Sequence, residues 1–329
     1  MERAGLPRRK WLAAAILALA GGVTLLMALA VAGLGAEGAK DAPPPVQRPT
    51  HPSLFFDGAT FYRAVQAAES TPAMEGPVLG GIIPHHWLPG HLITGFFQGL
   101  AASDAPDTVV ILGPNHTNAG SAQALTSDLA WETPFGLVRP NQSLIAALTA
   151  RGLVKLEPWS LTTEHSVASI MPAVKYYLPE ARVVPVVLSG DLMPTEARRL
   201  GEALAGLWND GLVIVAAVDF SHYLVRAEAE RHDAVTVALL EAFDADTLLT
   251  LDNAYLDSPP SIAVLLVAME QLGVEHFVLV ENTNSGALQG DELMPTTSYI
   301  VGYYTPTALP SAASADTPRS SPPLSPGEE

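Results

Sequence analysis

The 329-residue chain contains no cysteine. This absence excludes disulfide bonds as a source of stability, and it excludes thiolate as a nucleophile or a metal ligand. Any metal ion must therefore be held by histidine, carboxylate or carbonyl groups.

Basic residues are also scarce, with 17 lysines and arginines against 34 acidic residues and a net charge of −17. Nucleic-acid binding needs a concentrated basic surface, so we expect no nucleic-acid partner. The sequence has neither a phosphate-binding glycine loop nor a G-x-S-x-G motif. Nucleotide hydrolysis and serine-esterase chemistry therefore lack their motifs.

Charge is absent from Trp11 to Ala36, a run longer than the roughly 20 residues needed to cross a bilayer. The basic cluster in residues 1–10 predicts a cytoplasmic N-terminus and an extracytoplasmic globular domain on a single-pass cell-membrane protein. PRRKWL, residues 7–12, also resembles a twin-arginine export signal, which leaves export by that route as the alternative.

The chain outside this run divides by composition. Residues 37–52 are proline-rich and predict a linker in which His51 is exposed to solvent. Residues 306–329 are rich in proline and serine and predict a disordered tail. We therefore expect one folded domain over residues 53–305.

Short apolar runs alternate with amphipathic stretches in this domain. The runs predict strands at residues 78–83, 108–113, 181–188, 212–218, 276–282 and 297–304. The amphipathic stretches predict helices at residues 91–103, 166–178, 194–208, 223–243 and 261–273. Together they predict an α/β fold with a largely parallel or mixed sheet flanked by helices.

Titratable side chains follow three of these strands. His85 follows the first, His116 the second, and Asp219 and His222 the fourth. Ligands of α/β sheets bind beyond the carboxyl ends of the strands, so we expect one shared site. Two imidazoles and a carboxylate can hold a divalent metal with open coordination positions, as in non-haem iron and zinc enzymes.

Individual roles follow from residue type. His85, His116 and Asp219 are the expected metal ligands, although Asp219 could instead orient a ligating imidazole. His222 suits a ligand or a general acid–base. Asp219 and Ser221 would alternatively cap a following helix. His165 suits either the same pocket or a helix start, where Thr162, Thr163 and Glu164 offer caps.

Several motifs, namely PHHWLPG, LGPNHT, EHSVASIMP, VDFSHY and a closing NSG with SYIVGYY, resemble those of the Memo-like family, which includes AmmeMemoRadiSam system protein B. The resemblance covers about residues 77–305. It implies a fold similar to class III extradiol dioxygenases, with His85 and His116 at the metal, Asp219 and His222 in the same pocket, and a metal-binding, redox or signalling role. Iron(II) is the metal it favours, with zinc as the alternative.

The chain departs from the family pattern at four places. His86 replaces a small residue, and Ala168 and Ile170 replace an acidic and a polar residue. DSPPS, residues 257–261, replaces a Cys-Gly pair, and Ala287 falls on a Cys or acidic position. The third ligand then falls to Asp219, His222, His86 or Glu281, or to water.

Two classes of function follow. The first is a membrane-anchored, dioxygenase-like oxidoreductase with an iron site and His222, Asp219 and His165 as catalytic residues. The second is a non-catalytic metal-binding or interaction module with a vestigial site and a small-molecule or protein ligand. A zinc-dependent hydrolase is a weaker third. Trp87, His91, His232 and His276 are expected to be structural or surface residues.

Overall fold

The computed structural model describes residues 48–68, 74–103 and 105–306. Within these residues no helix is long and apolar enough to cross a membrane. The anchor expected at residues 11–36 and the export motif at residues 7–12 lie outside the described residues, as do residues 37–47 of the proline-rich linker and residues 307–329 of the C-terminal tail.

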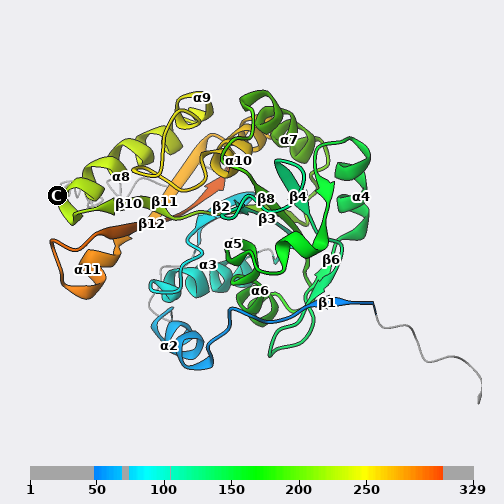
Figure 1. Cartoon of the computed structure of the whole chain (residues 1–329), viewed down its shortest axis with the longest axis horizontal. Coiled ribbons are helices and arrows are strands. Elements are labelled where there is room, and N and C mark those ends of the chain that lie inside the picture. Colours follow the sequence, from blue (N-terminus) through cyan, green and yellow to red (C-terminus); the bar gives the residue numbers. More distant parts are fainter. Residues whose placement is uncertain (1–47, 69–73, 104, 307–329) are drawn as a thin grey trace, which may run out of the picture. The chain divides into compact units, whose positions relative to one another are not determined.

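Residues 48–306 form a mixed α/β domain around a ten-stranded sheet (Figure 1). The strands of this sheet are β2 (Gly80–Ile83), β3 (Thr108–Pro114), β4 (Ala124–Thr126), β6 (Arg139–Pro140), β7 (Lys155–Leu156), β8 (Arg182–Leu188), β9 (Leu212–Ala217), β10 (Phe220–Leu224), β11 (His276–Asn284) and β12 (Thr296–Thr305). Its order is β10-β12-β2-β9-β3-β8-β4-β7, with β11 also paired to β12 and β6 to β8. The neighbours β2, β9, β3 and β8 are parallel, whereas β12 runs antiparallel to β2.

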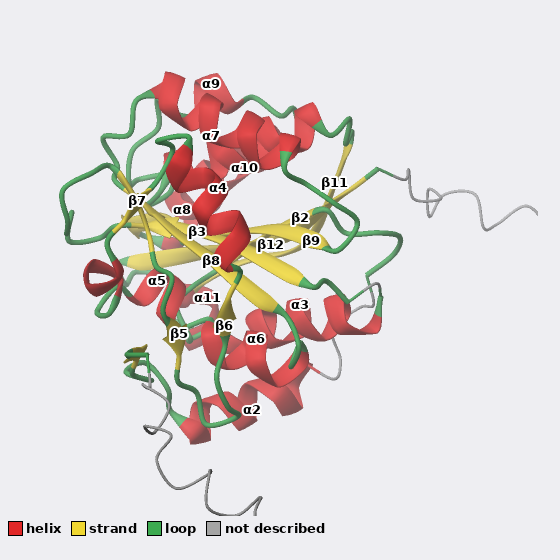
Figure 2. Cartoon of the chain, turned by 90° about the vertical axis from the view of Figure 1, so that its right-hand side faces the viewer, coloured by secondary structure: helices red, strands yellow, loops and turns green. Residues whose placement is uncertain are grey.

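Helices cover both faces of the sheet (Figure 2). One face carries α4 (Gln142–Ala150), α7 (Pro194–Gly206), α8 (Arg226–Glu241), α9 (Ala245–Leu248) and α10 (Pro259–Gln271). The other carries α2 (Gly58–Ala68), α3 (Gly90–Ala102), α5 (His165–Ala168) and α6 (Met171–Tyr177). The remaining elements are η1 (Pro158–Leu161), α11 (Ser285–Gln289) and a separate parallel pair of β1 (Thr50–His51) with β5 (Ala130–Trp131).

Strand β3 shows why the central strands read as continuous apolar runs. Val110 and Leu112 pack in the core under α7 and α10, whereas Val109 and Ile111 pack in the core under α3 and α6. Successive side chains of a strand point to opposite faces, and here both faces are buried. The expected strands at residues 108–113, 181–188 and 212–218 are therefore found almost unchanged.

Strand β2 lies where two helices approach the sheet most closely. A Cβ on Gly80 would lie 2.7 Å from Met269 of α10, and a Cβ on Gly81 would lie 2.1 Å from the Phe96 ring of α3. The two adjacent glycines therefore allow one helix to pack on each face of the same strand.

Two expected helices differ from the structure. The stretch expected at residues 166–178 is divided into α5 and α6, and Pro172 lies in the first turn of α6, where a missing N–H is tolerated. The stretch expected at residues 223–243 begins as strand β10, and α8 starts only at Arg226. Asp219 and Ser221 therefore cap no helix. Ser221 donates instead to Asp233, at 2.6 Å.

The predicted exposure of His51 is wrong. Its side chain is fully buried, stacks on Trp131 with ring centroids 4.0 Å apart, and bonds to Ser127 Oγ and Thr162 Oγ1. Burial lowers its pKa to about 4. The folded domain therefore includes β1, which local composition had placed in the linker.

Candidate metal centre

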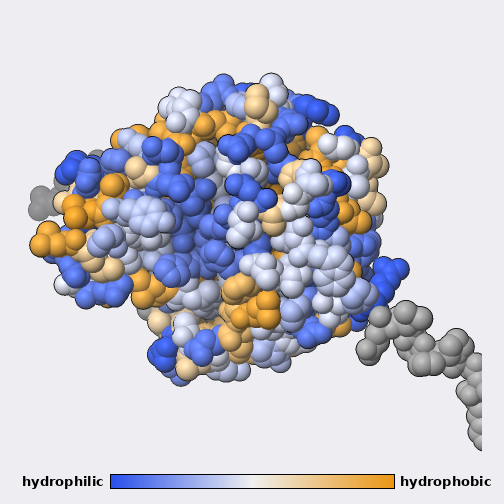
Figure 3. Space-filling model, viewed as in Figure 1, coloured by the Kyte–Doolittle hydropathy of each residue, from blue (hydrophilic) through white to orange (hydrophobic). Residues whose placement is uncertain are grey.

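Three polar side chains meet at the carboxyl ends of neighbouring strands. His85, Asp219 and His116 each lie two residues beyond the last residue of β2, β9 and β3, which are adjacent in the sheet. His85 and Asp219 are buried, and the side chain of His116 is 30 % exposed. Figure 3 shows hydrophilic residues gathered in the middle of the face where β2 and α5 lie in Figure 1. The shared site expected from the strand ends is therefore formed.

Hydrogen bonds fix the ring of His85. Its Nδ1 lies 3.1 Å from the carbonyl oxygen of Ala217, which can only accept, so Nδ1 carries the proton. The backbone N–H of His85 donates to Asp219 Oδ1 at 3.2 Å, and Ser169 Oγ donates to the His85 carbonyl at 3.1 Å. Nε2 is left as the basic nitrogen that a metal can use.

His116 is oriented in the same way by Glu164. Its Nδ1 donates to Glu164 Oε1 at 2.8 Å, and its backbone N–H donates to Glu164 Oε2 at 2.9 Å. Ser166 N–H also donates to Glu164 Oε1, so the carboxylate that caps α5 also directs His116. Carboxylate–histidine pairs of this kind set the tautomer of metal-binding imidazoles.

Asp257, which precedes α10, supplies a carboxylate that the sequence had not suggested. Its Oδ2 lies 3.4 Å from His85 Nε2 and 3.6 Å from His116 Nε2. Both of its oxygens are buried, and neither has a hydrogen-bond partner among the described residues. The backbone N–H of Asp257 donates to the Asp219 carbonyl at 3.0 Å, which ties it to the end of β9. A buried carboxylate without a hydrogen bond is costly unless a cation lies beside it, and protonated His116 or a bound metal ion would supply that cation.

The spacing of these atoms suits a metal ion. Ligand bonds of about 2.1 Å at tetrahedral angles place ligand atoms about 3.4 Å apart. The separations of Asp257 Oδ2 from the two Nε2 atoms, and the 3.6 Å from His85 Nε2 to Asp219 Oδ2, are close to this value. The donor set of imidazole nitrogen and carboxylate oxygen therefore fits a divalent cation.

Potential ligand atoms form two groups among the described residues. One contains His85, His116 and His165, and the other contains His85, Asp219 and Asp257, each with its atoms within 4.8 Å of one another. His165 thus lies in the pocket as well as at the first position of α5. Its ring stacks on His116 with centroids 4.2 Å apart and lies 5.2 Å from His85.

The charges in the site shift several pKa values. Burial lowers the pKa of His116, but the carboxylates of Asp257 and Glu164 outweigh burial and raise it to about 10. Burial raises the pKa of Glu164, but bonds from His116 and Ser166 prevail and lower it to about 2. Burial, with the nearby imidazoles of His116 and His85, lowers the pKa of His165 to about 4.

Asp219 is buried, and this burial raises its pKa. Its Oδ1 already accepts the His85 backbone N–H, whereas Asp257 has both oxygens free of such bonds. Asp219 Oδ1 thus holds the His85 backbone, whereas Asp219 Oδ2 belongs with Asp257 to the group of atoms that could hold a metal ion.

The other proposed third ligands lie outside both groups. His86 is exposed, and its Nδ1 lies 3.0 Å from Tyr299 Oη. Glu281 is exposed on β11, and Ala287 lies in α11. His222 lies on β10 with a buried Nδ1 that has no hydrogen-bond partner among the described residues, and burial lowers its pKa. His222 remains a nearby group, without a ligand position.

The residues expected to be structural behave accordingly. His91 is the second residue of α3, and Trp87 Nε1 donates to Ser169 O at 3.1 Å. His232 stacks on Tyr255 with its Nδ1 at 2.9 Å from Ala254 O, and His276 begins β11.

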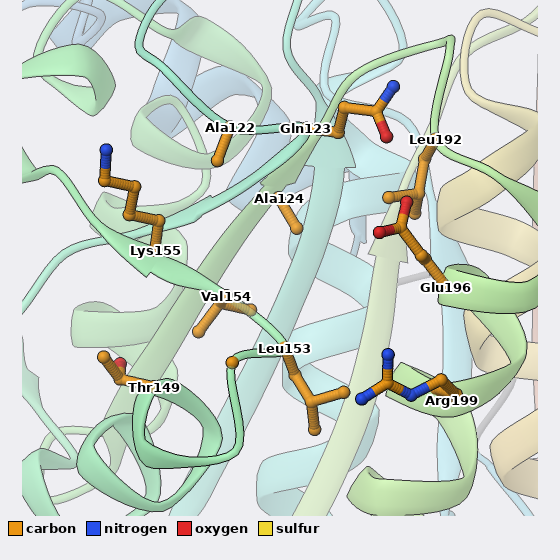
Figure 4. A pocket seen from close by; sticks show the side chains of 11 residues that line it. Ala122, Gln123, Ala124, Thr149, Leu153, Val154, Lys155, Leu192, Glu196 and Arg199 are labelled. Atoms are coloured by element: carbon orange, nitrogen blue, oxygen red, sulfur yellow. The ribbon is translucent and has the colours of Figure 1, made fainter.

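A pocket of about 410 Å³ lies away from these groups, between α4, β7 and α7 (Figure 4). Glu196 and Arg199 of α7 line one side, and Lys155 of β7 lines the other. Lys155 pairs with Glu157 at 2.8 Å. No residue of the two ligand groups lines this pocket, so it is separate from the metal centre.

Comparisons with known proteins show which family the chain resembles. The Memo-like protein family model matches residues 63–305. A MEMO1 family protein of Methanopyrus kandleri is 32 % identical over 241 residues, covering 70 % of this chain and 83 % of that protein. A MEMO1 family protein of Pyrobaculum aerophilum is 28 % identical over 228 residues, covering 67 % and 81 %.

A solved structure, that of an uncharacterized protein from Escherichia coli K12, aligns with a TM-score of 0.47 and 14 % identity, covering 68 % of this chain and 99 % of the other. The family match covers most of the chain and includes every residue of the two ligand groups. The chain therefore belongs to the Memo-like protein family.

Proposed function

We propose that this protein binds one divalent metal, iron(II), through His85, His116 and Asp257. The observation that carries the proposal is the Asp257 carboxylate, buried without a hydrogen-bond partner among the described residues and 3.4 and 3.6 Å from the two Nε2 atoms. Each imidazole has its Nδ1 proton held elsewhere, so Nε2 is the nitrogen that would bind the metal. At His116 the metal would displace the proton that a pKa of about 10 keeps there at pH 7.

Two histidines and one carboxylate form the facial set that non-haem iron(II) oxygenases use. This set leaves coordination positions for a substrate and for dioxygen, and a bound iron would supply the activation of dioxygen. A closed structural zinc site would need four protein ligands, so the donor set favours iron over structural zinc. Asp257 belongs to the DSPPS stretch that stands where the family has a Cys-Gly pair, and it supplies the third ligand of the proposed site.

Neighbouring side chains would handle protons during an oxidation. His165 is neutral at pH 7 because its pKa is about 4, and its side chain is 44 % exposed. With Nδ1 facing Glu164 Oε1 at 3.5 Å, its Nε2 is free to accept a proton from a bound hydroxyl. His222 is a second neutral imidazole near the carboxylates.

The membrane location stays part of the proposal. It is supported by the uncharged run of residues 11–36 after a basic N-terminus, and it places the metal site outside the cytoplasm.

Oxygen uptake tests the enzymatic part of the proposal. The full chain, loaded anaerobically with iron(II), is mixed with catechol and dioxygen in an oxygen electrode chamber, and His165→Phe is the matched variant. We expect substrate-dependent uptake that His165→Phe reduces at least tenfold while its iron content stays unchanged. Stoichiometric iron without any uptake would leave the alternative, a metal-binding module without catalysis.

A further inference from the structure

An aromatic pocket lies beside the metal centre. Its volume is about 150 Å³, and it is lined by Phe55, Phe56, Asp57, Thr60, Phe61 and Trp87. The rings meet at tilted angles, with centroids 5.5 Å apart for Phe56 and Phe61 and 5.7 Å apart for Phe61 and Trp87. Four aromatic side chains thus surround a space open to solvent at one side.

The pocket adjoins the metal site through two contacts. The Phe55 ring lies 6.1 Å from the His165 ring, which stacks on His116. Trp87 follows His85 by two residues, and its Nε1 donates to Ser169 O, while Ser169 Oγ donates to the His85 carbonyl. The Phe55 wall of the pocket therefore lies next to His165, and the Trp87 wall is bonded to the residue that holds the His85 carbonyl.

Most of this pocket comes from outside the family match. The match begins at residue 63, whereas five of the six lining residues lie between Phe55 and Phe61. The segment that carries them connects β1 to α2, and the burial of His51 fixes its start. The aromatic walls therefore come mostly from the segment that precedes the residues matched by the family model.

We infer that the pocket binds a single uncharged aromatic ring of a substrate, whose hydroxyl substituent faces the metal centre; this inference rests on the proposed function. An apolar cavity of about 150 Å³ holds a benzene-sized guest. Aromatic walls favour an aromatic guest over a saturated ring of equal size, because ring edges and faces attract each other.

Asp57 sets the charge that the pocket accepts. It is exposed, and its Oδ1 accepts the backbone N–H of Thr60 at 2.7 Å, so it stays at the pocket wall. Hydrogen bonds from the side chain and then the backbone of Thr60 lower the pKa of Asp57, so its carboxyl group is ionised at neutral pH. A negative wall disfavours an anionic ring, so phenol is preferred over benzoate.

Calorimetric titration of the full chain with phenol, cyclohexanol and benzoate tests the inference. Phe55→Ala removes one wall at a residue that is already 36 % exposed, and Leu54→Ala removes a neighbouring exposed side chain that does not line the pocket. We expect phenol to bind at least fivefold more tightly than the other two probes. Phe55→Ala should weaken phenol binding about tenfold, and Leu54→Ala should leave it unchanged.

Equal binding of phenol and cyclohexanol, or equal phenol binding by wild type and Phe55→Ala, would overturn the inference. Each titration is repeated after a chelator has removed the metal. None of the residues that line the pocket is a proposed metal ligand, so phenol binding should not depend on the metal. Loss of iron binding with retained Phe55-dependent phenol binding would refute the proposed function alone. Iron binding without Phe55-dependent phenol binding would refute the pocket alone.

Discussion

Glu164 offers a sharp test of how the metal centre is built. Its two oxygens accept three N–H bonds, from His116 Nδ1, His116 N and Ser166 N, at 2.8, 2.9 and 2.9 Å. Glu164→Gln keeps the shape of the side chain but replaces one carboxylate oxygen with an amide NH2 group. This NH2 group would face an N–H donor and cannot accept its hydrogen bond. Loss of such a partner lowers metal affinity by about 10- to 100-fold.

The same substitution has a smaller opposite effect. Glu164 is one of the two carboxylates that hold the pKa of His116 near 10. Without it, protons compete less with the metal at pH 7, so we expect the net loss at the lower end of the range, about tenfold.

The assay is anaerobic competition for iron(II) against a chromogenic chelator, with Glu180→Gln as the control. Glu180 is exposed and lies in neither ligand group, so its substitution removes the same charge and should leave the affinity unchanged. An affinity of Glu164→Gln within twofold of wild type, or an equal loss in Glu180→Gln, would refute the role given to Glu164.

Three further predictions concern stability, measured by denaturant unfolding at several pH values. Burial raises the pKa of Asp233 to about 6, so wild type should lose about 2 kcal/mol relative to Asp233→Asn as pH rises from 4 to 6; parallel curves would contradict this. Burial lowers the pKa of His51 to about 4, so wild type should lose about 3 kcal/mol relative to His51→Gln as pH falls from 6.5 to 4. An equal loss in both proteins would mean that the ring is exposed. Gly81→Ala should cost 1–3 kcal/mol at pH 7, since its Cβ would lie 2.1 Å from Phe96, whereas Gly190→Ala, with no atom within 4 Å, should cost far less.

The apolar pattern of the sequence predicted the strands that are buried on both faces, because such strands need apolar residues at successive positions. Strands buried on both faces, such as β3 and β9, are continuous apolar runs, and their polar ends located His85, His116 and Asp219. Strand β10 was not predicted, because it forms through its pairing with β12 and is irregular. It has register shifts at His222 and a positive φ of 63° at Tyr223. No local period encodes such a strand.

The burial of His51 and the position of Asp257 in the site were not predicted, for a related reason. The burial of His51 depends on β5 and Trp131, about eighty residues away, so its proline-rich surroundings gave no signal. Asp257 stands before two prolines at a helix start, where an acidic residue suggests a cap. Its backbone bond to Asp219 O and the Leu256–Phe220 bridge bring it between the imidazoles.

The metal content of anaerobically purified protein tests the central claim most directly. Wild type is compared with Asp257→Ala, and with Glu281→Ala as the matched loss of an exposed carboxylate. The account predicts one equivalent of iron in wild type and in Glu281→Ala, and its loss in Asp257→Ala. A wild-type protein without stoichiometric metal, or a folded Asp257→Ala that retains it, would contradict the account.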